Sequence, residues 1–428
     1  MRLNLKHSVG AALLALPFVF LGCSSASDDT TTSSGTGTKE TTVEVFSWWT
    51  APGEAEALQT LISLNRSLHP KESVFNAAAQ GHIDPGTDAK LLLATRIEQG
   101  KPPDLFQTNA KDMYAFIDAH PGGVQPLDDL FAAEGLNDSV APEVLKDVTY
   151  QGHVYAVPVN IHRDNSLFYN KTIFAQHGLK PPTTMAEFMS TCEALKKAGV
   201  TPLALSTSQS WIIEKLFMSL AVGTMGSKAF LDNFTGAKPF DADELKPALA
   251  AVNKVMTDYI DVDASAADTY GWTQATESVY NGSAAMFIHG DWVKGYLVQL
   301  GWTPDVDFGV VTSPGTEGVF LYGMDVFGVP TGAKNPEGAR DFVRTISSTK
   351  GQIGFNVVKG SSPVRLDVPT DEFDSMGQQV AAEFKNAKHR IASVATLAAW
   401  DKALVDLART HDEAAALQAY LDNPPVAK

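Results

Sequence analysis

From residue 41 onward, two hydrophobic patterns alternate along the chain. Short apolar runs such as 42–46 and 284–288 are typical of buried strands, whereas 54–69 repeats its leucine and isoleucine side chains at helical spacing. This alternation predicts an α/β fold with mainly parallel sheets. The pattern predicts further helices at 87–99, 171–178, 184–198, 210–222, 244–258, 272–281 and 337–347, a strand at 102–107, a hairpin at 148–158, and mostly helix after about residue 370.

The first 40 residues do not share this alternation. Two basic residues, Arg2 and Lys6, precede an apolar run that is shorter than the roughly 20 residues needed to span a membrane but suits the core of a signal peptide. Phe20-Leu-Gly-Cys23 resembles a bacterial lipobox, which implies cleavage before Cys23 and lipidation of that residue. Ser, Thr and Gly dominate the residues that follow. We therefore predict a signal peptide over 1–22 and a lipidated, flexible tether over 23–40.

Composition narrows the class of protein. The 428 residues include 33 Lys and Arg against 49 Asp and Glu, a formal net charge of −16, and 44% are hydrophobic, which predicts a globular protein of two or three domains. The acidic excess argues against a nucleic-acid partner and against a polybasic membrane patch. Two cysteines exclude a disulfide scaffold and a four-thiolate zinc site. We expect Cys192 to be a core thiol in a helix that Thr184 and Glu187 cap.

Motifs that mark several enzyme classes are absent from the sequence. It contains no GxxxxGK[ST], GxGxxG, HExxH or GxSxG, so no cofactor and no metal are expected. Asp261-Val-Asp begins like a calcium loop, but Ala266 stands where the turn glycine belongs and Trp272 where the bidentate glutamate belongs. The ten histidines are scattered and are expected to be solvated or in the core.

A series of short motifs lies between residues 46 and 366. They are Phe46-Ser-Trp-Trp49, 102–107, 155–163, His289-Gly-Asp-Trp292, 308–320, 327–335 and 359–366. In this order they resemble the sugar-binding proteins of bacterial ABC importers, and in particular their glucose/mannose branch. The resemblance covers nearly all of 41–428.

The resemblance implies a two-lobed periplasmic-binding-protein-like fold of type II, with a ligand cleft between the lobes. Crossing segments are expected near 155–166, 287–292 and 345–351. The first lobe would hold 41–160 plus 290–345, and the second 161–289 plus 346–428. The lobes of such proteins close over the ligand about a hinge.

The chemistry of a sugar directs attention to particular residues of the first lobe. Aromatic rings cover the C–H patches of a pyranose, while carboxylate, ammonium and amide groups bond to its hydroxyls. Trp48 and Trp49 stand where a strand opens into a helix, and because adjacent strand residues face opposite sides, we expect only one in the cleft. Glu54 is a candidate acceptor of hydroxyl protons, with an ordinary first-turn acid as the alternative.

The resemblance places further ligand residues in the opposite lobe and at a crossing segment. Trp211 and Trp272 would line the cleft, Asp291 would accept from two hydroxyls, and Lys359 would donate to a hydroxyl oxygen. Each has an alternative: core packing for Trp211, a helix N-cap for Asp291 and a solvated surface for Lys359.

Two positions depart from the related glucose binders. Asn109 stands where they carry His or Lys, and Thr396 falls where they often carry His. Because Asn and Thr are shorter and neutral, the pocket can be wider, which admits a different hexose, a pentose or a disaccharide.

The sequence thus predicts a lipid-anchored, monomeric receptor facing the periplasm or cell exterior. It would capture a neutral sugar, with a glucose-like monosaccharide as the first candidate, and deliver it to an ABC permease. A disaccharide, an oligosaccharide or a polyol is the alternative ligand. The alternative from another class is a secreted carbohydrate-active enzyme with Glu54 and Asp291 as its acid/base pair, and a third is a structural lipoprotein without a saturable ligand.

Overall fold

The computed structural model describes residues 41–78, 85–392 and 397–425. The described residues all belong to one compact unit. The predicted signal peptide, Cys23 with its tether, and Thr396 lie outside the described residues. Within the described ranges, no helix is both long and apolar enough to cross a membrane.

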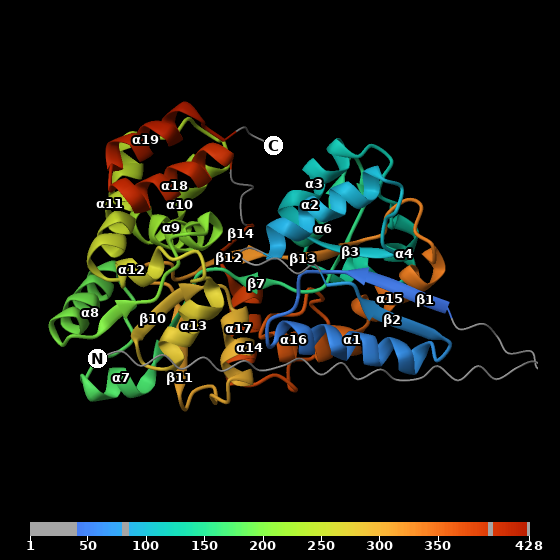
Figure 1. The fold of residues 1–428 in the computed structure, drawn as a ribbon, viewed down its shortest axis with the longest axis horizontal. Coiled ribbons are helices and arrows are strands. Elements are labelled where there is room, and N and C mark those ends of the chain that lie inside the picture. Colours follow the sequence, from blue (N-terminus) through green and yellow to red (C-terminus); the bar gives the residue numbers. More distant parts are fainter. Residues whose placement is uncertain (1–40, 79–84, 393–396, 426–428) are drawn as a thin grey trace, which may run out of the picture. The chain divides into compact units, whose positions relative to one another are not determined.

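A five-stranded sheet organises the first hydrophobic core (Figure 1). Its strand order is β2-β1-β3-β13-β6, with β1 parallel to β2 and β3, and β13 antiparallel to β3 and β6. The strands are β1 (Thr41–Phe46), β2 (Glu72–Asn76), β3 (Leu105–Asn109), β6 (Val157–Pro158) and β13 (Asp325–Gly328). The helices that contribute to this core are α1 (Glu54–Leu68), α2 (Pro85–Glu98), α3 (Ala110–Ala119), α4 (Asp128–Ala133), α5 (Leu136–Ser139), α6 (Pro142–Asp147), α15 (Pro336–Ser347) and α16 (Thr349–Lys359).

A four-stranded sheet organises the second core. Its order is β11-β8-β10-β9, where β8 runs antiparallel to both neighbours and β9 lies parallel to β10. The strands are β8 (Ser166–Asn170), β9 (Thr201–Leu203), β10 (Ala284–His289) and β11 (Phe308–Thr312). The helices of this core are α7 (Lys171–Gln176), α8 (Met185–Lys197), α9 (Ser210–Met225), α10 (Ser227–Phe234), α11 (Ala242–Asp258), α13 (Trp272–Tyr280), α14 (Trp292–Gln299), α18 (Ala398–Thr410) and α19 (Glu413–Asp422). The short helix α12 (Val262–Ser265) follows α11, and α18 and α19 pack on α9 and α11.

A third sheet joins the two cores. It has the order β14 (His389–Ala392), β12 (Val319–Gly323), β7 (His162–Arg163). Successive side chains of β12 point to opposite faces, so Phe320 and Tyr322 enter the first core while Val319 and Leu321 enter the second. Helix α17 (Ser375–Asn386) likewise contributes to both cores, and β4 (Thr149–Tyr150) with β5 (His153–Val154) forms a separate hairpin.

Several local expectations agree with the structure. Gln151 and Gly152 form the hairpin turn with φ values of 49° and 87°, the left-handed backbone that a two-residue turn of this kind requires. Thr184 and Glu187 form the capping box of α8. Cys192 is fully buried in the second core, where burial raises the pKa of its thiol.

One expectation about the sheets was wrong. The sheets are mixed and not mainly parallel, because strands that return from the opposite core, such as β13, enter antiparallel to their neighbours. The region after residue 370 is mostly helical as expected, with β14 between α17 and α18 paired to β12. Such pairings join segments far apart in the chain, which a local pattern does not register.

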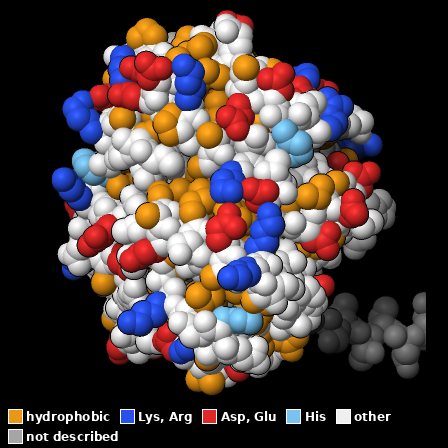
Figure 2. Space-filling view, turned by 90° about the vertical axis from the view of Figure 1, so that its left-hand side faces the viewer, with side chains coloured by type: hydrophobic (Ala, Val, Ile, Leu, Met, Phe, Trp, Pro, Cys, Tyr) orange, Lys and Arg blue, Asp and Glu red, His pale blue; other side chains and the backbone are white. Residues whose placement is uncertain are grey.

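The segments also divide between the cores differently from the expected boundaries. Residues 290–345 were assigned to the first lobe, yet β11 pairs with β8 of the second sheet, so the chain returns to the first core only through β12 and β13. The segment after 346 was assigned to the second lobe, yet α16 packs against α1 (Figure 1). The face shown in Figure 2 carries acidic and basic side chains intermixed, each sign interrupting the other.

Candidate functional site

A cleft of about 1130 Å³ is lined by residues from both hydrophobic cores. Seven of the nine predicted ligand residues lie in its lining, namely Trp48, Trp49, Glu54, Asn109, Trp211, Trp272 and Lys359. Asp291 is not part of the lining, and Thr396 is outside the described residues. The structure therefore brings together, at one place, residues that are up to about 300 positions apart in the chain.

Both adjacent tryptophans line the cleft, although only one was expected to do so. β1 ends at Phe46, so strand alternation does not govern Trp48 and Trp49. Trp49 is almost fully buried against Phe355, with ring centroids 5.0 Å apart. Trp48 is half-buried, and the Lys90 ammonium lies 5.5 Å from its ring.

An ion pair between α1 and α16 lies beside these rings. Lys359 Nζ donates to Glu54 Oε1 at 2.6 Å and also lies 5.7 Å from the Trp49 ring. Lys359 is 2% exposed, so the alternative of a solvated surface lysine is wrong. Gly53, directly before α1, allows a close approach to α14: its φ is 84°, and a Cβ there would come within 2.9 Å of the Gly295 backbone.

Asp325 is a cleft residue that the sequence interpretation missed. It is the first residue of β13 and stands directly opposite Asn109 of β3. Its Oδ1 accepts from the side-chain amides of Asn109 and Gln107, both at 3.2 Å, and Gln107 Oε1 in turn accepts from the Trp48 backbone N–H at 3.2 Å. Asp325 begins an otherwise apolar strand, and a buried acid needs hydrogen-bond partners. This was the feature of the sequence from which a functional role could have been inferred.

Asp291 has a different role from the one expected. Its Oδ1 accepts from His162 Nδ1 at 2.5 Å and its Oδ2 from the Arg163 backbone N–H at 2.9 Å. It occupies the N-cap position of α14, but its side chain does not bond to that helix. Because both carboxylate oxygens are held from within the protein and the residue is 3% exposed, Asp291 supports the cleft from behind.

His162 connects Asp291 to the cleft. Its second ring nitrogen, Nε2, lies 3.1 Å from Asp325 Oδ2. Burial lowers the pKa of His162, but the two carboxylates outweigh this effect and raise the pKa to about 8. Asp325 responds in the opposite sense: burial raises its pKa, and the hydrogen bond and charge of His162 bring the pKa below its ordinary value. A cationic imidazole thus lies between two carboxylates beneath the cleft.

The second core supplies an aromatic wall. Trp272 forms an edge contact with Tyr296 at 5.3 Å, and Trp211 lies 6.3 Å from Trp292. Trp292 was not expected here; its ring folds back over Gly290, where an added Cβ would meet it at 1.9 Å. Behind the wall, His289 is fully buried, and burial together with nearby cations lowers its pKa well below the ordinary value, so its imidazole is neutral.

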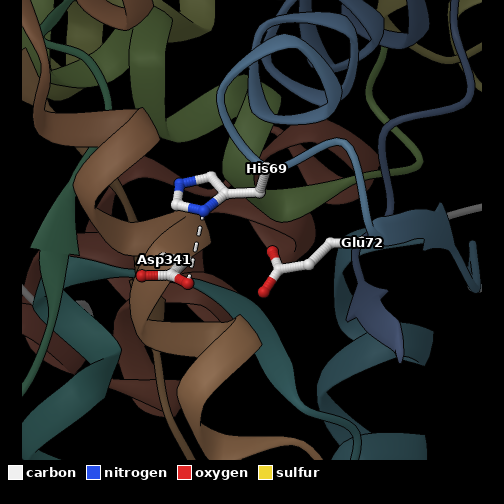
Figure 3. Close-up of side chains that lie close together, drawn as sticks. All are labelled: His69, Glu72 and Asp341. Atoms are coloured by element: carbon white, nitrogen blue, oxygen red, sulfur yellow. Dashed lines mark ion pairs between the residues drawn. The ribbon is translucent and has the colours of Figure 1, made fainter. Parts of the chain in front are cut away.

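One cluster in the described part of the chain has the donor types of a metal site. His69, Glu72 and Asp341 each offer one atom within 4.8 Å of the others (Figure 3). None of the three lines the cleft. Asp341 already accepts from Arg344 at 2.6 Å, and Glu72 accepts from Asn65 at 3.3 Å. The cluster is therefore explained as an ion pair of His69 with Asp341, 3.4 Å apart, and we assign no metal to it.

Two α/β cores around a cleft with an aromatic wall and paired charges define a receptor that encloses a solute. The model of the bacterial extracellular solute-binding protein family matches residues 83–353, and this chain belongs to that family. An ABC transporter extracellular-binding protein of Pyrococcus horikoshii is 32% identical over 90% of this chain and 85% of its own length. A probable sugar-binding periplasmic protein of Brucella melitensis is 31% identical over 81% of this chain and 80% of its own.

A solved structure supports the fold independently. The bacterial solute receptor AcbH, described as having an exclusive preference for β-D-galactopyranose, superposes with a TM-score of 0.74 at 16% identity and covers 90% of this chain and 98% of its own. The predicted two-lobed fold and the predicted family are confirmed. The prediction that the protein is a binding protein and not an enzyme is also confirmed, because the family and these relatives are solute-binding receptors. The family is extracellular, which agrees with the predicted export.

Proposed function

We propose that this protein is the sugar-capturing component of an ABC importer and that its ligand is a neutral, glucose-like monosaccharide. The observation that carries the proposal is the cleft lining, where tryptophans from both cores surround the Glu54–Lys359 and Asp325–Asn109 pairs. Sugar binding by relatives, as in the Brucella protein and AcbH, supports the ligand class.

The two kinds of group suit the two kinds of sugar surface. Indole rings such as Trp272 and Trp48 can cover the apolar faces of a pyranose, while the carboxylates of Glu54 and Asp325 accept from hydroxyls and Lys359 donates to them. These polar groups are held by one another before a ligand arrives, which lowers the entropic cost of binding.

A longer ligand has one observation in its favour. Sites for small molecules usually enclose about 300–1,000 Å³, and this cleft, with about 1130 Å³, is slightly larger than that range. A disaccharide, an oligosaccharide or a polyol therefore remains the alternative within the same function. The enzyme alternative has no such support, because Glu54 is ion-paired with Lys359 and Asp291 is held by His162.

The proposal extends to delivery and anchoring. After closure about the sheet that joins the two cores, the monomeric protein would dock on a membrane permease. Lipidation of Cys23, followed by the tether over 24–40, would keep it near that permease at the periplasmic or outer side of the membrane.

Calorimetric titration of the full chain against a sugar panel tests the proposal. We expect saturable binding of glucose, mannose or xylose, and a loss of at least tenfold in affinity for Trp272→Ala. Trp302→Ala is the matched control, since Trp302 stacks on Phe308 within the second core and is not part of the cleft lining. Absence of binding to glucose, mannose, xylose, disaccharides, longer glycans and polyols alike would refute the function.

A further inference from the structure

An ion pair joins the two walls of the cleft. Lys111 of α3 and Glu214 of α9 both line the cleft, and Lys111 Nζ lies 3.6 Å from Glu214 Oε2. α3 places Met113 in the first core, whereas α9 places Leu216 in the second. The pair is therefore a direct charge contact between the two cores, made across the space that a ligand enters.

On both walls, the charged residue lies close in sequence to a residue of the proposed sugar site. On α9, Glu214 follows Trp211 by three residues, so both lie on one helical face a turn apart. On the other wall, Lys111 follows Asn109, the residue that bonds to Asp325. Each charged residue thus lies two or three positions after a residue of the proposed sugar site.

The cleft continues past the pair. One turn beyond Glu214, Phe217 contacts Phe234 of α10, with ring centroids 6.0 Å apart. Phe234 is part of the cleft lining, as is Trp400 of α18, which lies 5.9 Å from the Phe234 ring. The cleft lining therefore includes a second pair of aromatic rings, Phe234 and Trp400, which contacts α9 one turn after Glu214.

The burial of the carboxylate makes the pair hard to displace. The Glu214 side chain is 2% exposed, and in the described ranges Lys111 is the cation within ion-pair distance of it. Glu214 raises the pKa of Lys111, against the opposite effect of burial, so the lysine stays charged at neutral pH. A ligand long enough to reach Phe234 would have to separate the two groups and leave a buried charge without its partner.

We propose that the Lys111–Glu214 pair closes one end of the sugar site and so selects a monosaccharide over a longer glycan. The inference rests on the proposed function and deepens it, because it names the residues that limit ligand length. Selection of this kind works by making the wrong ligand unfavourable, without adding any contact to the right one.

Titration of Lys111→Ser with glucose, maltose and maltotriose tests the proposal. We expect the ratio of glucose affinity to maltose affinity to fall at least tenfold relative to the wild type. Lys111→Arg keeps the charge and should keep the wild-type ratio. Lys238→Ser, which removes the lysine of the Lys238–Glu244 pair outside the cleft, should also keep it. An unchanged ratio in Lys111→Ser would overturn the proposal.

A measurement without sugar separates this inference from the proposed function. Hydrogen exchange in peptides covering 109–119 and 210–225 should be faster in Lys111→Ser than in the wild type or Lys238→Ser, because the contact between the walls is lost. If the wild type binds no sugar, the proposed function fails. The ion pair as a link between the cores is then tested by exchange alone: faster exchange in Lys111→Ser than in the wild type supports it, and equal exchange overturns it.

Discussion

Removal of the Lys359 charge should produce a large and specific loss of stability. Lys359→Met keeps most of the aliphatic chain but leaves Glu54 without the ammonium group that lies 2.6 Å away. Breaking a fully buried ion pair from one side costs about 3–5 kcal/mol. Because the Glu54 side chain is 13% exposed and water can partly solvate it, we expect the lower end of that range, about 3 kcal/mol.

The size of the unit converts this free energy into a measurable shift. An unfolding entropy of about 2.1 cal/mol/K per residue over roughly 390 residues amounts to about 0.8 kcal/mol/K. The melting temperature of Lys359→Met should therefore fall by about 4 °C in differential scanning calorimetry. Lys238→Met removes a lysine from an ion pair outside the cleft and should leave the melting temperature within experimental error.

A double-mutant cycle distinguishes the ion pair from simple loss of packing. In Lys359→Met combined with Glu54→Gln, no unpaired carboxylate remains, so we expect the double variant to be more stable than Lys359→Met alone, with a coupling of about 2 kcal/mol. If the two single effects add, or if Lys359→Met melts like the control, the claim that this charge pair is buried and mutually dependent is wrong.

Three further predictions follow from other parts of the structure. The pKa of His162 is raised from 6.5 to about 8 in the folded protein, so its contribution to the free energy of unfolding is complete below pH 6.5 and is lost as the pH rises through 8. Thermal scans between pH 6.5 and 9.5 should show this free energy fall by roughly 2 kcal/mol, and His162→Gln should abolish the fall. Gly290→Ala should cost at least about 2 kcal/mol in urea unfolding, because the new methyl group displaces the Trp292 ring from its packed position; an unchanged midpoint would contradict that packing. Cys192 should react with a thiol reagent only after denaturation, since burial raises its pKa and removes it from solvent, and rapid reaction of the native protein would show that the burial is wrong.

Features that depend on neighbouring residues could be read from the sequence. The capping box of α8, the turn at Gln151–Gly152 and the start of α15 after Asn335 all involve residues within four positions of each other. Local chemistry determines such features, so a single sequence contains enough information to place them.

Features that depend on pairing between distant segments could not be predicted from the sequence. β13 enters the first sheet next to β3, more than 200 residues earlier in the chain, and its first residue, Asp325, thereby reaches Asn109. No sequence feature near Asp325 indicates that Asn109 is its partner. The same holds for Lys111 and Glu214, which are ordinary helix residues until the two cores face each other. The resemblance to solute-binding proteins pointed to Trp211 and Trp272 of the cleft lining, but not to Trp292 and Trp400. It also pointed to Asp291, an acid whose partner is His162.

The charges of the cleft favour a neutral ligand in spite of the acidity of the chain. Among the described residues of the lining, seven carboxylates stand against six lysine and arginine side chains and the cationic His162. The described lining therefore carries no excess of acidic residues, although the whole chain has a net charge of −16. A charged solute would disturb a set of groups that already balance one another, whereas a polyhydroxylated neutral solute can bond to both signs at once. On this argument a sugar acid or a sugar phosphate should bind less tightly than the parent neutral sugar.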